Sequence, residues 1–289
     1  MAARQGHHLM TGTPETRDGP DLSALVAVIS DIAIRAAAEI QQVAARPFEV
    51  SEKPDTSPVT EADERAEAII LAGLKAHYPD IPVVAEEEVA AGRIPDVSAG
   101  RFFLVDPLDG TKEFVKRRTD YTVNIALVEN GVPVAGVVCA PARLAIWRGY
   151  SDGDTHSAES SALSETLEVG AWRPMACRDC AEPPVIVASR SHVTPETTAF
   201  LDRYPQSECV SVGSSLKFCL VAQGEADIYP RFGPTMEWDT AAGDAVLRAA
   251  GGMTRTLDGE PLAYGRRGSE KPFLNPFFIA ALRANIVPQ

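Results

Sequence analysis

Acidic residues follow several of the short apolar segments in this sequence of 289 residues. Glu86 comes directly after one such segment, and Asp106 and Asp109 follow the next one. Asp239 lies where a later helix is expected to begin. Because α/β proteins gather their functional sites at strand ends and helix starts, we expect these four side chains to lie close together.

Each of these residues also has an ordinary structural explanation. Glu86 opens a run of three glutamates, and such a run is usually a solvated loop. Asp106 and Asp109, with Gly110 after them, fit a plain turn. Asp239 could be only a helix N-cap, a position where Asp is favoured. Taken singly, these explanations are preferred, but together the four acids favour a chemical role.

A cluster of such carboxylates needs compensation. Two carboxylates 4 Å apart repel by about 4 kcal/mol at an effective dielectric constant near 20. Protonation or bound cations would remove this repulsion. No His or Cys lies near these acids in the sequence, and oxygen ligands alone select hard ions such as Mg²⁺ or Mn²⁺. The sequence therefore predicts a metal site, with metal-assisted hydrolysis as its chemistry.

The segment DPLDG, residues 106–110, contains the small residues that such a site requires. Pro107 favours an extended Asp106, so the Asp106 carboxylate is aimed off the strand end. The turn would bring Asp109 back to the same point and expose the Leu108 carbonyl as a further oxygen ligand. Gly110 would allow close approach of the backbone.

A phosphate site is expected beside the metal site. Gly110 and Thr111 open the segment TKEFVKR, which we interpret as a short helical turn with free backbone N–H groups. Asp63 lies one turn into an expected helix, at Thr60-x-x-Asp63. It could complete a capping arrangement or orient a water molecule and accept its proton. The sequence favours neither role of Asp63 over the other.

The expected elements that position these residues fall into two parts. Residues 21–45 and the segment after Thr60 read as helices, and Asn130-Gly131 marks a hairpin. We interpret 151–183 as a loose polar stretch. Beyond it, strands and helices alternate, which indicates an α/β layer. We expect a layered αβ sandwich, divided into a disordered leader (1–20), an antiparallel α+β domain (21–182) that carries most of the metal ligands, and an α/β domain (183–289) that carries Asp239.

Composition excludes several functions. The formal net charge of −13 argues against nucleic acid or anionic membrane as a partner. We find no window of about eighteen apolar residues and expect no membrane span.

The five cysteines are odd in number and scattered, so we expect a reducing cytoplasm. Cys177 and Cys180 form a lone C-x-x-C, which is weak support for a zinc site.

Motifs along most of the chain resemble the metal-dependent, lithium-sensitive phosphatases of the inositol monophosphatase superfamily. From about residue 25 to the end they occur in that family's order: SPVTEAD, AEEE, DPLDGTKEF, YTVNIALV, GSSLKFC, WDTAAGDAV and FLNP. Within the superfamily the chain looks most like the CysQ-type 3′(2′),5′-bisphosphate nucleotidases. Inositol monophosphatases usually carry an uncharged residue and then Asn where this chain has Lys112 and Glu113. The resemblance implies a layered αβαβα sandwich of the sugar phosphatase type.

The resemblance also implies roles for individual residues. The ligands of two or three Mg²⁺ ions, with Mn²⁺ as a substitute, would be Glu86, Asp106, the Leu108 carbonyl, Asp109 and Asp239. Asp63 and Thr111 match the pair that activates the attacking water. Substrate contacts would come from the residues of this site and of the later loops: Leu108, Asp109, Gly110, Thr111, Gly213, Ser214, Ser215, Lys217, Arg231 and Asp239.

The implied substrate is a small bisphosphorylated adenosine nucleotide, 3′-phosphoadenosine 5′-phosphate, a by-product of sulfate assimilation that would be cleaved to AMP and phosphate. Its second phosphate needs a counter-charge. The helix opening at Gly213-Ser214-Ser215 could hold it through backbone amides, and Lys217 and Arg231 are either phosphate ligands or ordinary surface charges. Phe232 and Tyr229 are guesses for adenine stacking. A sugar phosphatase and a non-catalytic nucleotide sensor are the alternatives, and the oligomeric state stays open.

Overall fold

The computed structural model describes residues 19–52, 58–153, 155–189, 194–267 and 271–282. The leader expected at residues 1–20 therefore lies almost entirely outside the described residues. Within the described ranges the strands form a two-stranded ribbon, a seven-stranded sheet and a five-stranded sheet. The ribbon pairs β1 (Val50–Glu52) with β2 (Pro58–Thr60).

The larger sheet has the strand order β3-β4-β5-β6-β7-β8-β9, so each strand lies beside its neighbours in sequence. Only β3 and β4 are parallel within this order, and the other neighbours are antiparallel. The hairpin expected at Asn130-Gly131 is confirmed, because it joins β5 to β6. The strands are β3 (Val83–Ala85), β4 (Arg101–Asp109), β5 (Thr122–Glu129), β6 (Val132–Ala140), β7 (Ala145–Asp152), β8 (Thr155–Ala162) and β9 (Arg173–Pro174).

The prediction of a loose polar stretch at residues 151–183 is wrong for its first part, which forms a strand. β8 pairs with β7 along its whole length, from Thr155 to Ala162. Its sequence, THSAESSA, is polar and only two of its residues are buried. The main-chain hydrogen bonds to β7 therefore hold this strand, and no alternation of apolar residues marks it in the sequence.

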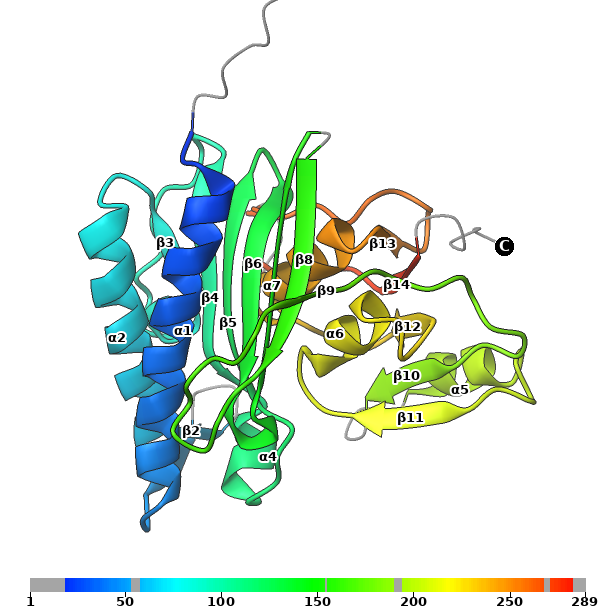
Figure 1. Ribbon diagram of the computed structural model, residues 1–289, viewed down its shortest axis with the longest axis horizontal. Helices are drawn as coiled ribbons and strands as arrows, with labels where there is room; N and C mark the ends of the chain where they lie inside the picture. The colour runs from blue at the N-terminus through cyan, green and yellow to red at the C-terminus, as the bar shows by residue number, and fades with distance from the viewer. Residues whose placement is uncertain (1–18, 53–57, 154, 190–193, 268–270, 283–289) are drawn as a thin grey trace, which may run out of the picture.

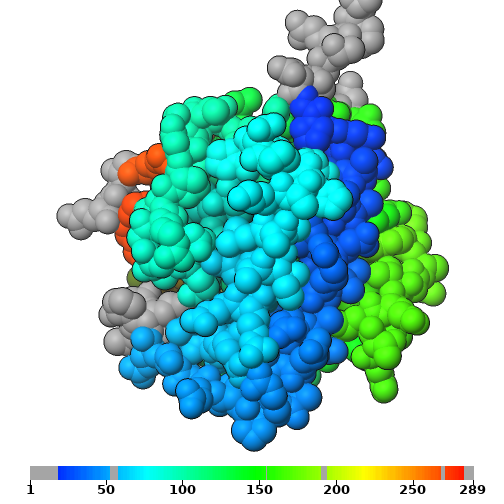
Figure 2. Space-filling view, turned by 90° about the vertical axis from the view of Figure 1, so that its left-hand side faces the viewer, coloured from blue at the N-terminus to red at the C-terminus, as the bar shows by residue number. Residues whose placement is uncertain are grey.

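Two long helices cover one face of the larger sheet (Figure 1). α1 (Leu22–Ala44) begins after Asp21, whose carboxylate accepts hydrogen bonds from the amides of Ser23 and Ala24. α2 (Glu61–His77) begins after Thr60 in a capping box. Both helices confirm the sequence prediction. Figure 2 shows this face, with α1 in blue and α2 in cyan.

The five-stranded sheet has the order β11-β10-β12-β14-β13, and its first three strands are parallel. β13 was not expected from the sequence. Helices α6 and α7 lie between the two sheets, and α5 lies beyond the smaller one (Figure 1). The elements are β10 (Ile186–Ser189), α5 (Pro195–Leu201), β11 (Cys209–Val212), α6 (Leu216–Ala222), β12 (Ile228–Arg231), α7 (Glu237–Ala249), β13 (Gly252–Thr256) and β14 (Phe278–Leu282).

The order of layers is thus helix, sheet, helix, sheet, helix, which confirms the αβαβα sandwich (Figure 1). One large apolar cluster lies between α1, α2 and the larger sheet, and another joins both sheets to α6 and α7. The second cluster crosses the expected boundary near residue 182, so a division into two domains stays a prediction. No helix in the described ranges is long and apolar enough to cross a membrane.

Candidate active site

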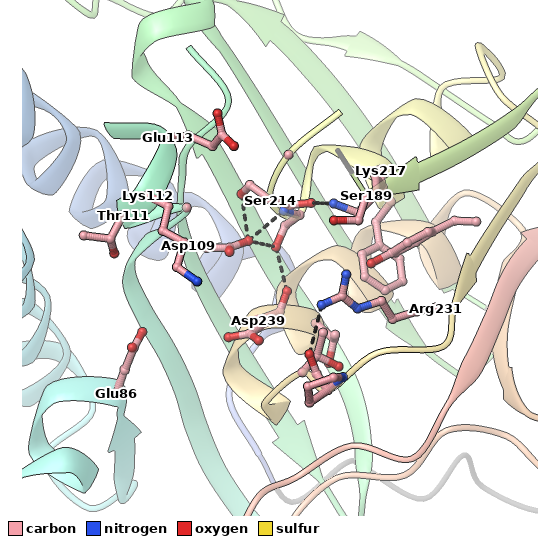
Figure 3. A pocket seen from close by; sticks show the side chains of 18 of the residues that line it. Glu86, Asp109, Thr111, Lys112, Glu113, Ser189, Ser214, Lys217, Arg231 and Asp239 are labelled. Atoms are coloured by element: carbon pink, nitrogen blue, oxygen red, sulfur yellow. Dashed lines mark hydrogen bonds between the residues drawn. The ribbon is translucent and has the colours of Figure 1, made fainter. Parts of the chain in front are cut away.

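One pocket collects most of the candidate residues (Figure 3). It opens where β3 and β4 end and where α4 (Thr111–Val115), α6 and α7 begin. It therefore lies at strand ends and helix starts, as expected. The candidates that line it are Glu86, Asp109, Gly110, Thr111, Gly213, Ser214, Ser215, Lys217, Arg231 and Asp239. Asp63, Asp106 and Leu108 are buried and lie outside this lining.

An irregularity in β4 determines how its two aspartates are placed. Asp106 pairs with Asn124 on β5, and Asp109 pairs with Thr122. The two pairs are three residues apart on β4 but only two residues apart on β5, so β4 contains one extra residue between them. Residues three apart in a regular strand point to opposite faces. The extra residue of this bulge offsets that alternation. The segment DPLD therefore brings both aspartates to one side of the strand end.

Asp109 is held by the turn that precedes α6. Its Oδ2 accepts hydrogen bonds from Ser214 Oγ at 2.7 Å and from the Ser215 amide at 2.7 Å. Ser215 Oγ lies 2.9 Å from the same oxygen and 2.7 Å from the Asp239 carbonyl. Ser215 thus connects the end of β4 to the first turn of α7.

Two amides of the turn before α6 already have protein partners. The amide of Ser215 donates to Asp109, and the amide of Gly213 donates to Asp120 Oδ2 at 3.1 Å. Two of the three amides expected to hold an anion are therefore paired with protein carboxylates. The Gly213–Ser215 turn does line the pocket, so a contact between its side chains and a substrate stays a prediction.

Gly110 has the backbone conformation that its position requires. Its φ of 97° lies in the region that side chains rarely adopt. A Cβ at this residue would also lie 2.8 Å from the Asp120 carbonyl oxygen. Gly110 therefore lets the end of β4 turn into α4 close to Asp120, whose side chain accepts the hydrogen bond from Gly213.

Asp239 is the third residue of α7, because the helix begins at Glu237 and not at Asp239 as expected. Its Oδ2 accepts a hydrogen bond from the Met236 amide at 2.8 Å, so it has the capping role as well as a place in the pocket. Burial, followed by the charges of Asp109 and Glu86, raises the pKa of Asp239 well above its usual range. The three carboxylates therefore share one region of negative potential.

Glu86 begins a short helix, α3 (Glu86–Ala90), and not the solvated loop that its glutamate run suggested. Its carboxylate projects from α3 toward the pocket (Figure 3). The run continues with Glu88, whose carboxylate instead binds Arg93 Nε at 2.6 Å. Glu86 and Glu88, two glutamates of the same run, thus have different surroundings.

Asp63 and Thr111, which the resemblance pairs, lie within hydrogen-bonding distance of each other. Thr111 Oγ1 lies 3.0 Å from Asp63 Oδ1 and 3.2 Å from the Leu108 carbonyl, and its one proton serves one acceptor at a time. Asp63 Oδ2 accepts hydrogen bonds from the amide and hydroxyl of Thr60. Burial raises the pKa of Asp63 to about 6, although these hydrogen bonds act in the opposite direction. Asp63 therefore has the capping role, and its action on a water molecule stays a prediction.

Two cations form another part of the pocket wall (Figure 3). Lys217 is 3% exposed and its Nζ donates to the carbonyls of Val212 and Ser214, so it is no ordinary surface charge. Burial lowers the pKa of Lys217 to about 8, opposed by Asp109. Arg231 is also buried and donates from Nη2 to the Pro234 carbonyl. Within the described residues, the buried Arg231 Nε has no hydrogen-bond partner.

The guesses for an adenine platform receive little support. Tyr229 lines the pocket, but its ring packs edge-on against Phe218 and Phe278 in the core. Phe232 packs against Phe200 and does not line this pocket. Neither ring is therefore an evident stacking surface.

The lining of the pocket suits a hard cation in chemistry. Its Asp, Glu, Ser and Thr side chains supply oxygen donors, and it contains no described His or Cys. Among the described residues, however, no three acidic, His or Cys side chains form a ready metal-binding group. Asp106, Asp109 and Asp239 instead accept hydrogen bonds from nearby amides and hydroxyls.

Sequence reasoning missed several residues around the pocket. Glu113 lines it, 4% exposed and paired with Arg118 at 3.0 Å. Asn124 donates to Ser215 Oγ at 2.8 Å and lies 3.5 Å from Asp109. Its signal was available, because it is an amide inside the apolar run YTVNIALV. Asp120 and Glu67 had no comparable signal.

Comparisons with known proteins find similarity over most of the chain. The model of the Inositol monophosphatase family matches residues 21–284. The 3′(2′),5′-bisphosphate nucleotidase CysQ of Salmonella typhimurium is 46% identical over 252 residues, which cover 86% of this chain and 96% of that protein. CysQ of Escherichia coli K12 is 47% identical over 233 residues, which cover 81% of this chain and 89% of that protein. The crystal structure of CysQ from Bacteroides thetaiotaomicron is similar, with a TM-score of 0.73 and 37% sequence identity. The match covers 90% of this chain and 97% of that chain.

Proposed function

Because the chain belongs to the inositol monophosphatase family, we propose that it is a metal-dependent phosphatase, which cleaves the 3′-phosphate from 3′-phosphoadenosine 5′-phosphate to give AMP and phosphate. The observation that carries this function is the pocket of Figure 3. It combines the carboxylates of Glu86, Asp109 and Asp239 with the buried cations Lys217 and Arg231. The names of the relatives supply the nucleotide substrate.

We assign the metal ligands to five groups around the end of β4. They are the carboxylates of Glu86, Asp106, Asp109 and Asp239 and the carbonyl of Leu108. Two or three Mg²⁺ ions, or Mn²⁺ as a substitute, are the ions that these oxygen donors favour. When bound, such ions would neutralise charge on the phosphate and lower the pKa of an attacking water.

Asp63 and Thr111 act on that water. Thr111 Oγ1 accepts a proton from the water as it gives its own hydroxyl proton to Asp63 Oδ1, 3.0 Å away, and Asp63 is ionised above about pH 6. The water oxygen forms a bond to phosphorus as the bond from phosphorus to the 3′-oxygen breaks. The leaving 3′-oxygen takes a proton from a solvent water molecule to become the hydroxyl of AMP, and Asp63 returns its proton to solvent.

The 5′-phosphate is assigned to the cationic wall. Arg231 Nε is a buried donor without a protein partner, and such a donor costs free energy unless a ligand or water satisfies it. Lys217 lies beside it at the start of α6. A phosphate at this wall would accept a hydrogen bond from Arg231 and pair with the charge of Lys217.

We expect Lys217→Met and Arg231→Gln to raise the KM for 3′-phosphoadenosine 5′-phosphate by about tenfold or more, since a charge-assisted hydrogen bond contributes about 1.5–3 kcal/mol. Neither should change the KM for 3′-AMP, which has no 5′-phosphate. Initial rates of phosphate release measure both constants. Lys116→Met, an exposed lysine outside the pocket, is the matched control. Equal losses on both substrates would contradict the assignment.

A panel of phosphate esters tests the substrate. With Mg²⁺ present, we expect kcat/KM for 3′-phosphoadenosine 5′-phosphate to exceed that for inositol 1-phosphate by at least about 100-fold, which corresponds to about 2.7 kcal/mol from the second phosphate and the base. Omitting Mg²⁺ should stop turnover, and added Li⁺ should inhibit it. Preference for the inositol ester would instead support a sugar phosphatase, and tight binding without turnover a nucleotide sensor.

We propose the cytoplasm as the location, because the cysteines of the described residues are free and a reducing compartment maintains free thiols. The partner is a small bisphosphorylated nucleotide and not a nucleic acid, since the net charge of −13 opposes a polyanion.

A further inference from the structure

A second carboxylate of α2 lies buried near the site without lining the pocket. Glu67 follows Asp63 by one helical turn, so both project from the same face of α2. Glu67 is only 4% exposed. Glu67 takes no part in the proposed proton transfer. Burying a carboxylate is unfavourable unless strong hydrogen bonds compensate for the lost hydration.

The partners of Glu67 are two backbone amides of α3. Its Oε2 accepts from the amide of Glu87 at 2.9 Å, and its Oε1 accepts from the amide of Glu88 at 3.0 Å. These are first-turn amides, which no residue of the same helix can satisfy. The residue before the helix, Ala85, provides no side-chain cap. Glu67 therefore performs this task from another helix.

The contact fixes a helix that has little stability of its own. α3 contains five residues, far fewer than an isolated helix requires. Its first residue is Glu86, whose carboxylate enters the pocket (Figure 3). Because α2 carries both Asp63 and Glu67, the two hydrogen bonds set the position of Glu86 relative to Asp63.

We infer that Glu67 is a positioning residue for the cation site: it holds the first turn of α3 against α2, so that Glu86 is placed to bind a divalent cation together with Asp109. This inference rests on the proposed function. Glu67 itself touches neither substrate nor cation. A glutamine at this position has one acceptor oxygen, and its NH₂ group would face an amide N–H.

The test measures Mn²⁺ binding to the full chain without substrate, by electron paramagnetic resonance, together with the melting temperature. We expect Glu67→Gln to raise the Kd for Mn²⁺ by about tenfold. Glu67→Asp keeps both oxygens on a shorter side chain, and we expect a smaller rise of about threefold. Glu64→Gln, at an exposed position of the same helix, removes the same charge and should leave the Kd within about twofold.

A Glu67→Gln protein that melts at a lower temperature but binds Mn²⁺ like the wild type would overturn the inference, because Glu67 would then be only a structural cap. Should Glu67→Gln fail to fold, the same comparison with Glu67→Asp decides. A wild-type protein that binds no Mn²⁺ would overturn the metal site and this inference together. Wild-type binding with an unchanged Kd in both variants overturns this inference alone.

Discussion

Replacing Asp109 by asparagine should lower the turnover of 3′-phosphoadenosine 5′-phosphate by at least about 10³-fold, equivalent to about 4 kcal/mol in the barrier, while the chain stays folded. Three donors from Ser214 and Ser215 surround Asp109 Oδ2. The amide oxygen of asparagine would remain with these donors, and its NH₂ group would turn toward the cation site. A donor there repels a cation that a carboxylate binds.

Asp239→Asn should have a comparable effect for the same reason, since its one remaining oxygen stays on the Met236 amide. Phosphate release and circular dichroism measure activity and folding in both variants. Asp80→Asn, at an exposed position away from the pocket, is the control and should retain full activity. Activity within tenfold of wild type in either site variant would be incompatible with its role as a ligand.

Replacing Asp63 by asparagine should lower kcat by about 10²–10³-fold, the range expected when a group that accepts a proton is lost. Thr111 would keep an acceptor in the asparagine oxygen or the Leu108 carbonyl. The loss would therefore come from the missing proton acceptor and not from a displaced Thr111. Pre-steady-state and steady-state phosphate release would both detect it.

Asp63 also caps α2, so its variant needs a control for the cap alone. Thr60→Ala removes the capping hydroxyl, which also donates to Asp63, and should lower the free energy of unfolding by about 1 kcal/mol. At about pH 8, well above the pKa of Asp63, kcat should stay within about twofold. The wild-type rate should fall at acidic pH as Asp63 becomes protonated, with a midpoint below about 6 because turnover requires bound Mg²⁺, which favours the ionised carboxylate. Thr60→Ala and Asp63→Asn losing activity equally would mean that Asp63 acts only as a cap.

The sequence indicated most of the elements that position the site. Helices were expected at residues 21–45 and after Thr60, and α1 and α2 begin there, after caps at Asp21 and Thr60. These signals are local, because a capping side chain binds amides two or three residues away. The motif DPLDG marked the end of β4 for a similar reason, since Pro107 and Gly110 restrict or release the backbone at their own positions.

The remaining features depend on contacts between distant segments. β8 is a strand because β7 lies beside it, and its own polar sequence does not require that conformation. The surroundings of Lys217 and of the Ser215 amide depend on how α6 packs against β4 and β12. No pattern in the sequence shows that Glu67 reaches the amides of Glu87 and Glu88, twenty residues or more away.

Diffraction from crystals grown with Mn²⁺, recorded at a wavelength where manganese scatters anomalously, tests the metal site most directly. We predict anomalous peaks within bonding distance of the carboxylate oxygens of Glu86, Asp109 and Asp239. Those side chains should also have moved closer together than in the arrangement described here. A pocket without such a peak at saturating Mn²⁺, with Asp109 still bound to Ser214 and Ser215, would contradict the account.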